Sequence, residues 1–134
     1  MTEGIRLVRS DELGDRAPYA YAAVVAPGAG WVVTAGACPI DREGATVAVG
    51  DVAGQAEQVM ANLRAALRAA GADLDRVVKT TVYVATTSRA DLETAWGVVR
   101  SAFGEHDAPS TLLGVTVLGY PDQLVEVEAV AVLP

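Results

Sequence analysis

Two carboxylates near the end of this 134-residue chain, Glu126 and Glu128, are the side chains best suited to acid–base chemistry. They stand in an apolar run, Leu124 to Leu133, whose alternating pattern predicts a strand. Alternate residues of a strand share a face, so the two glutamates are expected about 7 Å apart on one face, among aliphatic side chains. Partial burial and a nearby like charge raise the pKa of a carboxyl group, which can then shuttle protons near neutral pH. A salt bridge to lysine or arginine at a subunit boundary explains the same pattern equally well.

Other residue types that often carry chemistry occur singly. His106 is the only histidine and lies in a Glu-His-Asp loop, where a solvated or capping role is expected. Because there is no second histidine and no cysteine pair, the sequence predicts no metal site. Cys38 lies beside Pro39 at a strand end and is expected to be a buried structural thiol, since a reactive cysteine needs an electropositive setting.

Three common site motifs are missing from the sequence. Gly28, Gly30 and Gly36 fit neither the P-loop pattern nor a Gly-x-Gly-x-x-Gly that opens a helix, so they are expected to shape turns. Ser110 and Thr111 have no Gly-x-Ser-x-Gly context and no paired base, which leaves a nucleophilic triad without support. The glutamates therefore remain the strongest candidates for catalysis.

An alternation of strands and helices is expected to position these residues. Strands are predicted over Ile5–Arg9, Tyr19–Val25, Trp31–Ala37, Val77–Val84, Thr111–Leu118 and Leu124–Leu133. Helices follow the N-caps Asp51 and Ser88, carry apolar residues at helical spacing, and end at Gly71 and Gly104. Ser88 opens a Ser-Arg-Ala-Asp sequence that fits a capping box. The order β-β-β-α-β-α-β-β predicts one α+β domain over residues 1–134, in which the second and third strands form a hairpin.

Two helices are enough to cover only one face of a sheet of five or six strands. The last strand is apolar on both faces, so its uncovered side is expected to pack against another copy of the chain. The sequence thus predicts a homo-oligomer, and sites in such assemblies often lie in clefts between subunits.

Composition excludes several functional classes. Hydrophobic residues make up 51% and charged residues 20%, which is typical of an ordered globular domain. A net charge of −7, with ten basic residues among seventeen acids, argues against nucleic-acid binding. No apolar stretch approaches the length of a membrane span, no signal peptide is visible, and the single cysteine fits a reducing cytoplasm.

Several stretches, taken together in order and spacing, resemble the Rid family, also called YjgF-like or L-PSP endoribonuclease-like. They are Pro18-Tyr19, Thr34-Ala-Gly-Ala-Cys-Pro-Ile40, Gln55 through Ala72, Asp75 through Val84, Phe103-Gly-Glu-His106, Pro109-Ser-Thr111 and Leu124-Val-Glu-Val-Glu-Ala-Val-Ala131. The resemblance covers nearly the whole chain.

This resemblance implies a chorismate-mutase-like fold, with two helices on one face of a mixed sheet, assembled as a homotrimer with three inter-subunit sites. It implies hydrolysis of reactive imines and enamines, a form of metabolite repair that needs no metal or bound cofactor. The family's glutamate, which positions the attacking water, corresponds to Glu126. A tyrosine that lines the pocket corresponds to Tyr19, and a family arginine clamps the substrate carboxylate.

The sequence departs from the family pattern at the arginine. The typical Pro-Ala-Arg-Ser/Thr loop is here Asp107-Ala-Pro-Ser-Thr111, so Pro109 stands in the place of the arginine. Proline offers neither charge nor donor, and a bidentate guanidinium is hard to replace as a carboxylate clamp. The serine and glutamine of the family's Thr-Ser-Gly-Gln are Ala35 and Ala37. Backbone groups near Ser110 are expected to orient the substrate instead.

Three functions follow as hypotheses. The first is an imine or enamine deaminase of altered specificity, acting through Glu126 on small molecules, for example ones without a carboxylate. The second is a non-catalytic homotrimer that binds a small molecule or regulates a partner through the same cleft. The third, a ribonuclease as in the older family name, fits poorly with the acidic charge balance.

Overall fold

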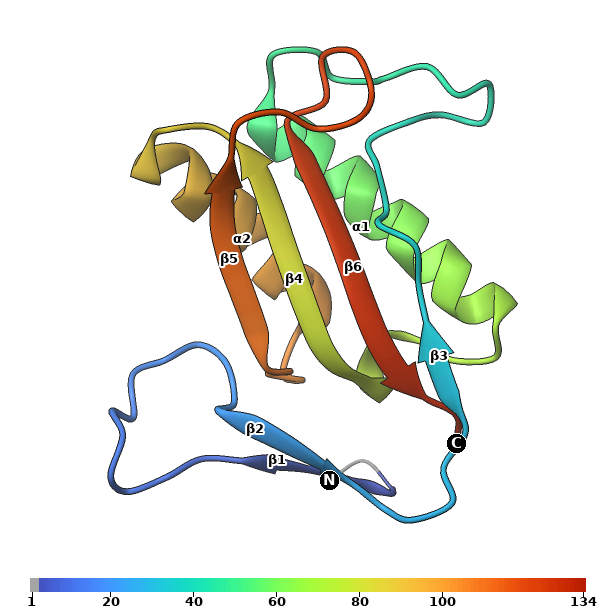
Figure 1. Ribbon diagram of the computed structural model, residues 1–134, viewed down its shortest axis with the longest axis vertical. Coiled ribbons are helices and arrows are strands. Elements are labelled where there is room, and N and C mark those ends of the chain that lie inside the picture. The colour runs from blue at the N-terminus through green and yellow to red at the C-terminus, as the bar shows by residue number, and fades with distance from the viewer. Residues whose placement is uncertain (1–2) are drawn as a thin grey trace.

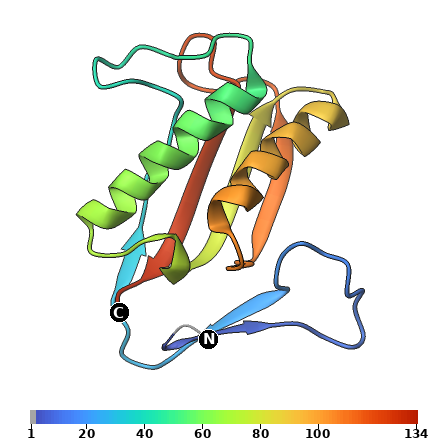
Figure 2. The same ribbon diagram turned by 180° about the vertical axis from the view of Figure 1, so that it is seen from behind.

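The computed structural model describes residues 3–134, which form two layers. Two helices lie side by side on one face of a four-stranded sheet, and the other face is open (Figures 1 and 2). The strands are β1 (Ile5–Val8), β2 (Ala22–Val25), β3 (Trp31–Val33), β4 (Val77–Ala85), β5 (Ser110–Val115) and β6 (Val125–Val132). The helices are α1 (Val52–Ala69) and α2 (Arg89–Phe103), with a short 3₁₀ turn, η1 (Leu74–Arg76), before β4. The predicted α+β class and element order are confirmed.

The main sheet has the order β3-β6-β4-β5 and is mixed. β6 pairs antiparallel with both β3 and β4, whereas β4 and β5 run parallel. The parallel pair follows from the helix α2 between its strands, because a crossover connection returns the chain in the same direction. β6, the strand that carries Glu126, is therefore an inner strand with partners on both sides.

The predicted pairing of the second and third strands is wrong. β2 pairs with β1 in a separate two-stranded sheet, and β3 joins β6. A sheet of five or six strands is likewise replaced by sheets of four and two, with the β1–β2 pair lying across one end of the larger one (Figure 1). A small apolar cluster of Ile5, Val78 and Val132 joins the two sheets.

Side-chain alternation along β6 agrees with the sequence prediction. Val125, Val127 and Ala131 are fully buried beneath the helices, where they meet the apolar stripe of α1. Glu126 is partly buried and Glu128 exposed on the opposite, open face. That face also carries Trp31 and Val33 of β3, which are 59% and 75% exposed.

The two helix starts differ in how they are capped. The Asp51 side chain accepts a hydrogen bond from the Gly54 amide at 3.0 Å, as expected of an N-cap. Ser88 makes no such side-chain bond, so the capping-box prediction is wrong. Instead Thr86 donates to Asp91 at 2.6 Å and accepts from the Ser88 amide at 3.0 Å. The Thr86 hydroxyl therefore lies between the Ser88 amide and the Asp91 carboxylate, two groups that a capping box would join directly.

Arg76 fastens the chain ends together from a buried position, with 7% of its surface exposed. Its guanidinium donates to the carbonyl oxygens of Val132 at 3.0 Å, Leu133 at 2.9 Å and Glu3 at 2.6 Å. Because charged donors to carbonyls are the stronger kind of hydrogen bond, this one side chain holds the end of β6 in place.

Candidate functional site

Glu126 lies on the open face of the sheet, directly across from Tyr83 of β4. The Tyr83 hydroxyl donates not to Glu126 but to Glu128, at 2.6 Å. This bond to a carboxylate, together with desolvation and the negative charges of Glu128 and Glu126, raises the pKa of Tyr83. Glu128 thus has a partner within the sheet, while the Glu126 carboxylate is held from outside it.

Two donors hold one oxygen of Glu126. The side-chain nitrogen Nε2 of Gln123 lies 3.1 Å from Glu126 Oε1, and the Cys38 Sγ lies 3.3 Å from the same oxygen. One donor comes from the loop before β6 and the other from the chain that runs beside it. The carboxylate is therefore oriented, with Oε1 engaged and Oε2 directed toward Gly36.

Gly36 lies where the predicted strand Trp31–Ala37 is interrupted. The Thr34 amide donates to the Ala129 carbonyl at 3.0 Å, and the Ala37 amide donates to that of Val127 at 2.7 Å. Between these bonds one chain advances by three residues and β6 by two, so an extra residue is accommodated as in a β-bulge. The strand ends early for this reason, at Val33.

With Glu126 in its observed position, only glycine fits at position 36. A Cβ added there would lie 2.6 Å from Cδ and 2.9 Å from Cγ of Glu126, closer than real side chains approach, and nearer still to Oε2. The bulge thus brings backbone against the carboxylate where a side chain would displace it.

The environment of Cys38 differs from the buried structural thiol that the sequence predicted. The side chain is partly exposed and contacts the candidate base. Desolvation, the hydrogen bond to Glu126 and its negative charge raise the pKa of the Cys38 thiol to about 11, with a smaller opposing effect from Gln123. The thiol is therefore protonated near neutral pH and acts as a donor to the carboxylate.

Tyr19 and Ser110 line a separate pocket of about 500 Å³ with Trp96, Thr111 and Leu112. Tyr19 meets Trp96 edge to face, with ring centroids 6.3 Å apart. Tyr19 was predicted to line a pocket, and it lies beside this cavity. Glu126 is not among the residues that line this cavity.

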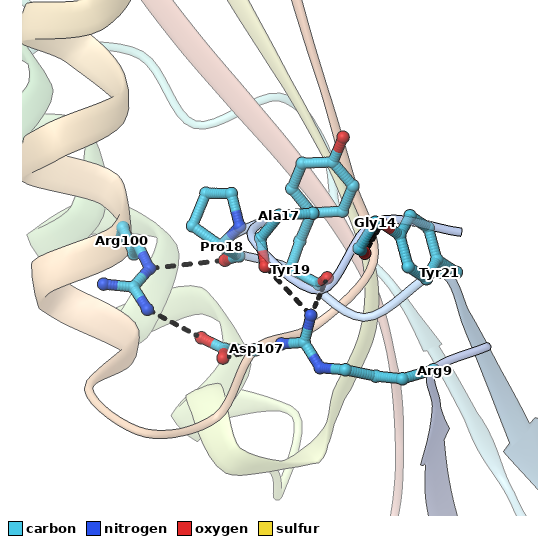
Figure 3. Close-up of polar contacts among 8 residues, drawn as sticks. All are labelled: Arg9, Gly14, Ala17, Pro18, Tyr19, Tyr21, Arg100 and Asp107. Atoms are coloured by element: carbon cyan, nitrogen blue, oxygen red, sulfur yellow. Dashed lines mark hydrogen bonds and ion pairs between the residues drawn. The ribbon is translucent and has the colours of Figure 1, made fainter. Parts of the chain in front are cut away.

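Two arginines and Asp107 fix the segment that carries Tyr19 (Figure 3). Arg9 donates to the carbonyls of Ala17 at 2.9 Å and Tyr19 at 2.8 Å, and to Asp107 at 3.0 Å. Arg100 of α2 lies 3.6 Å from the other Asp107 oxygen and donates to the Pro18 carbonyl at 3.3 Å. This network joins the Tyr19 segment to the loop before β5.

Pro109 and Ser110 interact mainly with β4. Pro109 is buried and accepts a hydrogen bond from the Thr80 amide at 3.0 Å, while the Ser110 hydroxyl pairs with that of Thr80. Ala35 is exposed and lines a different pocket, of about 560 Å³, between α1 and residues 35–42. The predicted site residues are thus divided: Glu126 on the open face, Tyr19 with Ser110 in one pocket, and Ala35 in another.

His106 has a structural role rather than a solvated one. Its Nε2 lies 2.7 Å from the Val77 carbonyl, and its ring packs 6.4 Å from that of Phe103. Over residues 3–134 there is no cluster of three histidine, cysteine or acidic side chains able to hold a metal ion. Within the same range, no lysine or arginine nitrogen lies within 4.0 Å of a Glu126 oxygen. Neither helix of the described chain is long and apolar enough to cross a membrane.

Sequence reasoning missed three members of this site: Gln123, Cys38 as a donor to Glu126, and Gly36 as a place of close approach. Gln123 lies in a loop without periodicity, and Cys38 is 88 residues from its partner. The only available signal was the pair of small residues around Gly36 opposite an acidic strand.

Comparison with known proteins identifies relatives along almost the whole chain. Residues 10–133 match the family model described as Endoribonuclease L-PSP. A RutC family protein of Pyrococcus abyssi is 35% identical over 114 residues, which cover 85% of each chain. The 2-iminobutanoate/2-iminopropanoate deaminase of Salmonella typhimurium is 37% identical over 75% of this chain and 78% of its own. A Rid-family protein of unknown function from Yersinia pestis superposes with a TM-score of 0.90 at 29% identity, covering 97% of this chain and 99% of that one.

Proposed function

The chain belongs to the Endoribonuclease L-PSP family of Rid/YjgF proteins, and on that premise we propose that it hydrolyses the carbon–nitrogen double bond of small imines or their enamine tautomers. The observation that carries the proposal is the oriented carboxylate of Glu126. One of its oxygens is held by Gln123 and Cys38, so the other is available as a proton acceptor. Relatives at 35% and 37% identity are named imine deaminases.

The proposed reaction adds one water molecule and releases ammonia. The imine reacts in its protonated form: Glu126 Oε2 accepts a proton from the water as the water oxygen attacks the imine carbon, which gives a neutral carbinolamine. The carboxyl group then returns this proton to nitrogen. As the carbon–nitrogen bond breaks, the hydroxyl proton passes to the Glu126 carboxylate and from there to the released ammonia, so that a carbonyl compound and ammonium remain. An enamine first takes a proton on carbon to become the imine. No redox cofactor is required by this balance.

Pro109 determines the expected substrate preference. Its side chain carries no charge, and it interacts with β4 through its backbone carbonyl. No cation lies within 4.0 Å of Glu126 in residues 3–134. We therefore propose altered specificity: small imines that lack a carboxylate are preferred over 2-iminoacids.

Self-association is part of the proposal. The face that carries Glu126 also exposes Trp31 and Val33, and neither helix of residues 3–134 covers it (Figure 1). Burying such side chains against a second copy is favourable. We propose a homotrimer in which a neighbouring subunit closes the space in front of Glu126, with a small molecule as the ligand.

Coupled oxidase assays test the proposed reaction. Amino-acid oxidases would generate imines with a carboxylate, and amine oxidases imines without one. The rate at which the carbonyl product and ammonia are released would be measured with and without the protein. We expect acceleration, greater for imines without a carboxylate, and loss of it in Glu126→Gln. Glu128→Gln is the matched control, because it removes the same charge from the same strand face. No acceleration with either kind of imine would refute the reaction.

A second function, non-catalytic binding of a small molecule, is favoured by the pocket of about 500 Å³ beside Tyr19 and Trp96, which Glu126 does not line. It predicts that a ligand raises the melting temperature equally in the parent protein and in Glu126→Gln, with no turnover. Ligand-dependent turnover that disappears in Glu126→Gln would exclude it.

A further inference from the structure

Gln123 is buried, with 4% of its surface exposed, although it lies in the loop that precedes β6. Its Oε1 accepts a hydrogen bond from the Tyr120 amide at 3.0 Å. Its amide nitrogen donates to the Val125 carbonyl and to Glu126 Oε1, each at 3.1 Å. A flipped amide would put oxygen against a carbonyl and a carboxylate, and NH₂ against an NH. The three contacts therefore fix which end of the side chain faces Glu126.

The loop that carries Gln123 is itself held by α1. Gln55, which is fully buried, donates to the Asp122 carbonyl at 2.9 Å and accepts from the Leu124 amide at 2.7 Å. The residues on both sides of Gln123 are thus tied to a helix of the main core. Such second-layer bonds set the orientation of a group that must react.

Cys38 adds a second donor to the same oxygen from the segment after β3, which runs beside β6. Both donors reach Oε1, at 3.1 Å from Gln123 and 3.3 Å from Cys38. Gly36 leaves room for Oε2 by having no side chain. These three residues therefore make the two oxygens of Glu126 different, although none of the three would itself accept a proton from water.

We propose that Gln123, assisted by Cys38, is a positioning residue that fixes the Glu126 carboxylate so that Oε2 alone acts as the base. The effect on turnover rests on the proposed imine hydrolysis, whereas the orientation of the carboxylate depends only on the contacts among these side chains. A base held in one orientation loses little rotational freedom on reaching the transition state, and misplacing it slows the chemical step rather than substrate binding.

Gln123→Met is the direct test, because methionine has similar length but no donor. We expect kcat to fall at least about tenfold while KM changes less than about twofold, as for an interaction used only in the transition state. Glu57→Met is the control, since Glu57 lies on the exposed side of α1 and its side chain is in none of the hydrogen bonds or ion pairs found within residues 3–134. Unchanged kcat in Gln123→Met, in an otherwise active protein, would overturn the inference and leave the proposed function intact.

The single cysteine provides a second readout that does not depend on turnover. The rate of Cys38 alkylation by iodoacetamide would be titrated against pH in the intact protein, because the four tyrosines ionise in the same pH range and their absorbance near 240 nm would hide that of the thiolate. Because the Glu126 carboxylate raises the pKa of Cys38 and Gln123 lowers it, we expect Glu126→Gln to shift the titration to lower pH and Gln123→Met to shift it to higher pH. If neither variant moves the titration, the contacts are absent and the inference fails whatever the activity.

Cys38 variants keep the test decisive if Gln123→Met does not fold. Cys38→Ala removes a donor, whereas Cys38→Ser retains one at the same place. We expect kcat to fall in Cys38→Ala and to recover in Cys38→Ser, at equal melting temperature. Equal kcat in both would contradict the positioning role. A parent protein without turnover, but with the expected shifts in the thiol titration, would refute the proposed function and retain the geometry.

Discussion

Replacing Gly36 by alanine places a methyl group where the Glu126 carboxylate lies. The added Cβ would stand 2.6 Å from Cδ and 2.9 Å from Cγ of Glu126. The backbone cannot retreat easily, because the hydrogen bonds that join Ala37 to Val127, at 2.7 Å and 3.1 Å, fix the chain next to Gly36. The carboxylate must therefore move, and it gives up its bonds to Gln123 and Cys38 when it does.

The cost of Gly36→Ala follows mainly from the lost hydrogen bonds, because the clashing atoms are the end of a flexible side chain that can swing away. Each lost hydrogen bond of a partly exposed group costs about 0.5–1.5 kcal/mol. With two bonds lost, we expect the free energy of unfolding to fall by about 1–3 kcal/mol. A displaced base also misses the attacking water, so kcat should fall by at least about a hundredfold.

Gly97→Ala is the matched control for the same chemical change. Gly97 lies in α2, where an added Cβ meets nothing within 4 Å. Alanine in an exposed helix should raise the free energy of unfolding by about 0.5–1 kcal/mol. Both variants would be compared by urea denaturation, imine turnover and titration of the Cys38 thiol, whose pKa should fall toward its ordinary value only in Gly36→Ala. Parent-like stability and turnover in Gly36→Ala would refute the close packing around Glu126.

Three further outcomes are expected. Arg76→Met should lower the free energy of unfolding by about 2–4 kcal/mol in urea denaturation, because three carbonyls lose a charged donor; a change below 1 kcal/mol, on the order of a surface substitution, would contradict this account. Asp107→Asn should cost only about 1 kcal/mol, since its ion pairs are partly exposed, yet raise KM by loosening the bonds from Arg9 that place Tyr19; an unchanged KM would argue against that role. Cys38, with a pKa of about 11, should hold about a hundredfold less thiolate at pH 8 than a thiol of pKa 9. Because the thiolate of higher pKa is the better nucleophile, alkylation of Cys38 should be only about tenfold slower, and its rate should rise with pH up to about 11. A rate that stops rising near pH 9 would exclude the raised pKa.

The sequence predicts the architecture where local patterns decide it. Period-two alternation from Leu124 to Leu133 correctly divides the last strand into a buried face and a face with both glutamates. Helical spacing after Asp51 and the cap itself are also correct. These features depend on which side of each segment is buried against the core, and the spacing of apolar residues within one segment is enough to predict that side.

Strand pairing and strand length could not be predicted in the same way. β2 and β3 are close in the chain and look like a hairpin, but β3 gains more by pairing with β6, an inner strand about a hundred residues later. The strand after Trp31 stops at Val33 because of the bulge opposite β6, and alternation alone does not reveal an extra residue. Pairing partners are a tertiary choice that local propensity does not encode.

In the candidate site, too, some features can be predicted from one stretch of sequence and others depend on the fold. Glu126 is predictable as an acidic residue in an apolar strand, and the resemblance adds its role. Gln123 and Cys38 become visible only when the loop before β6 and the chain after β3 meet around one oxygen. Gln123 is only three residues from Glu126, but this spacing does not show that its side chain turns toward the carboxylate. Cys38 is 88 residues away, so the orientation of the carboxylate is information that only the fold supplies.

The charges around Glu126 give a physical reason for the proposed preference for neutral imines. A substrate carboxylate about 5 Å from the Glu126 carboxylate is repelled by about 1 kcal/mol in water, and by about 3 kcal/mol at an effective dielectric constant of about 20. In the family pattern an arginine offsets this repulsion, whereas Pro109 offsets none of it. Within residues 3–134 no other cation approaches Glu126 within 4.0 Å. The repulsion corresponds to a factor of about five to a few hundred in kcat/KM, so the ratio between imines without and with a carboxylate would reveal any positive charge that the proposed neighbouring subunit presents to this face.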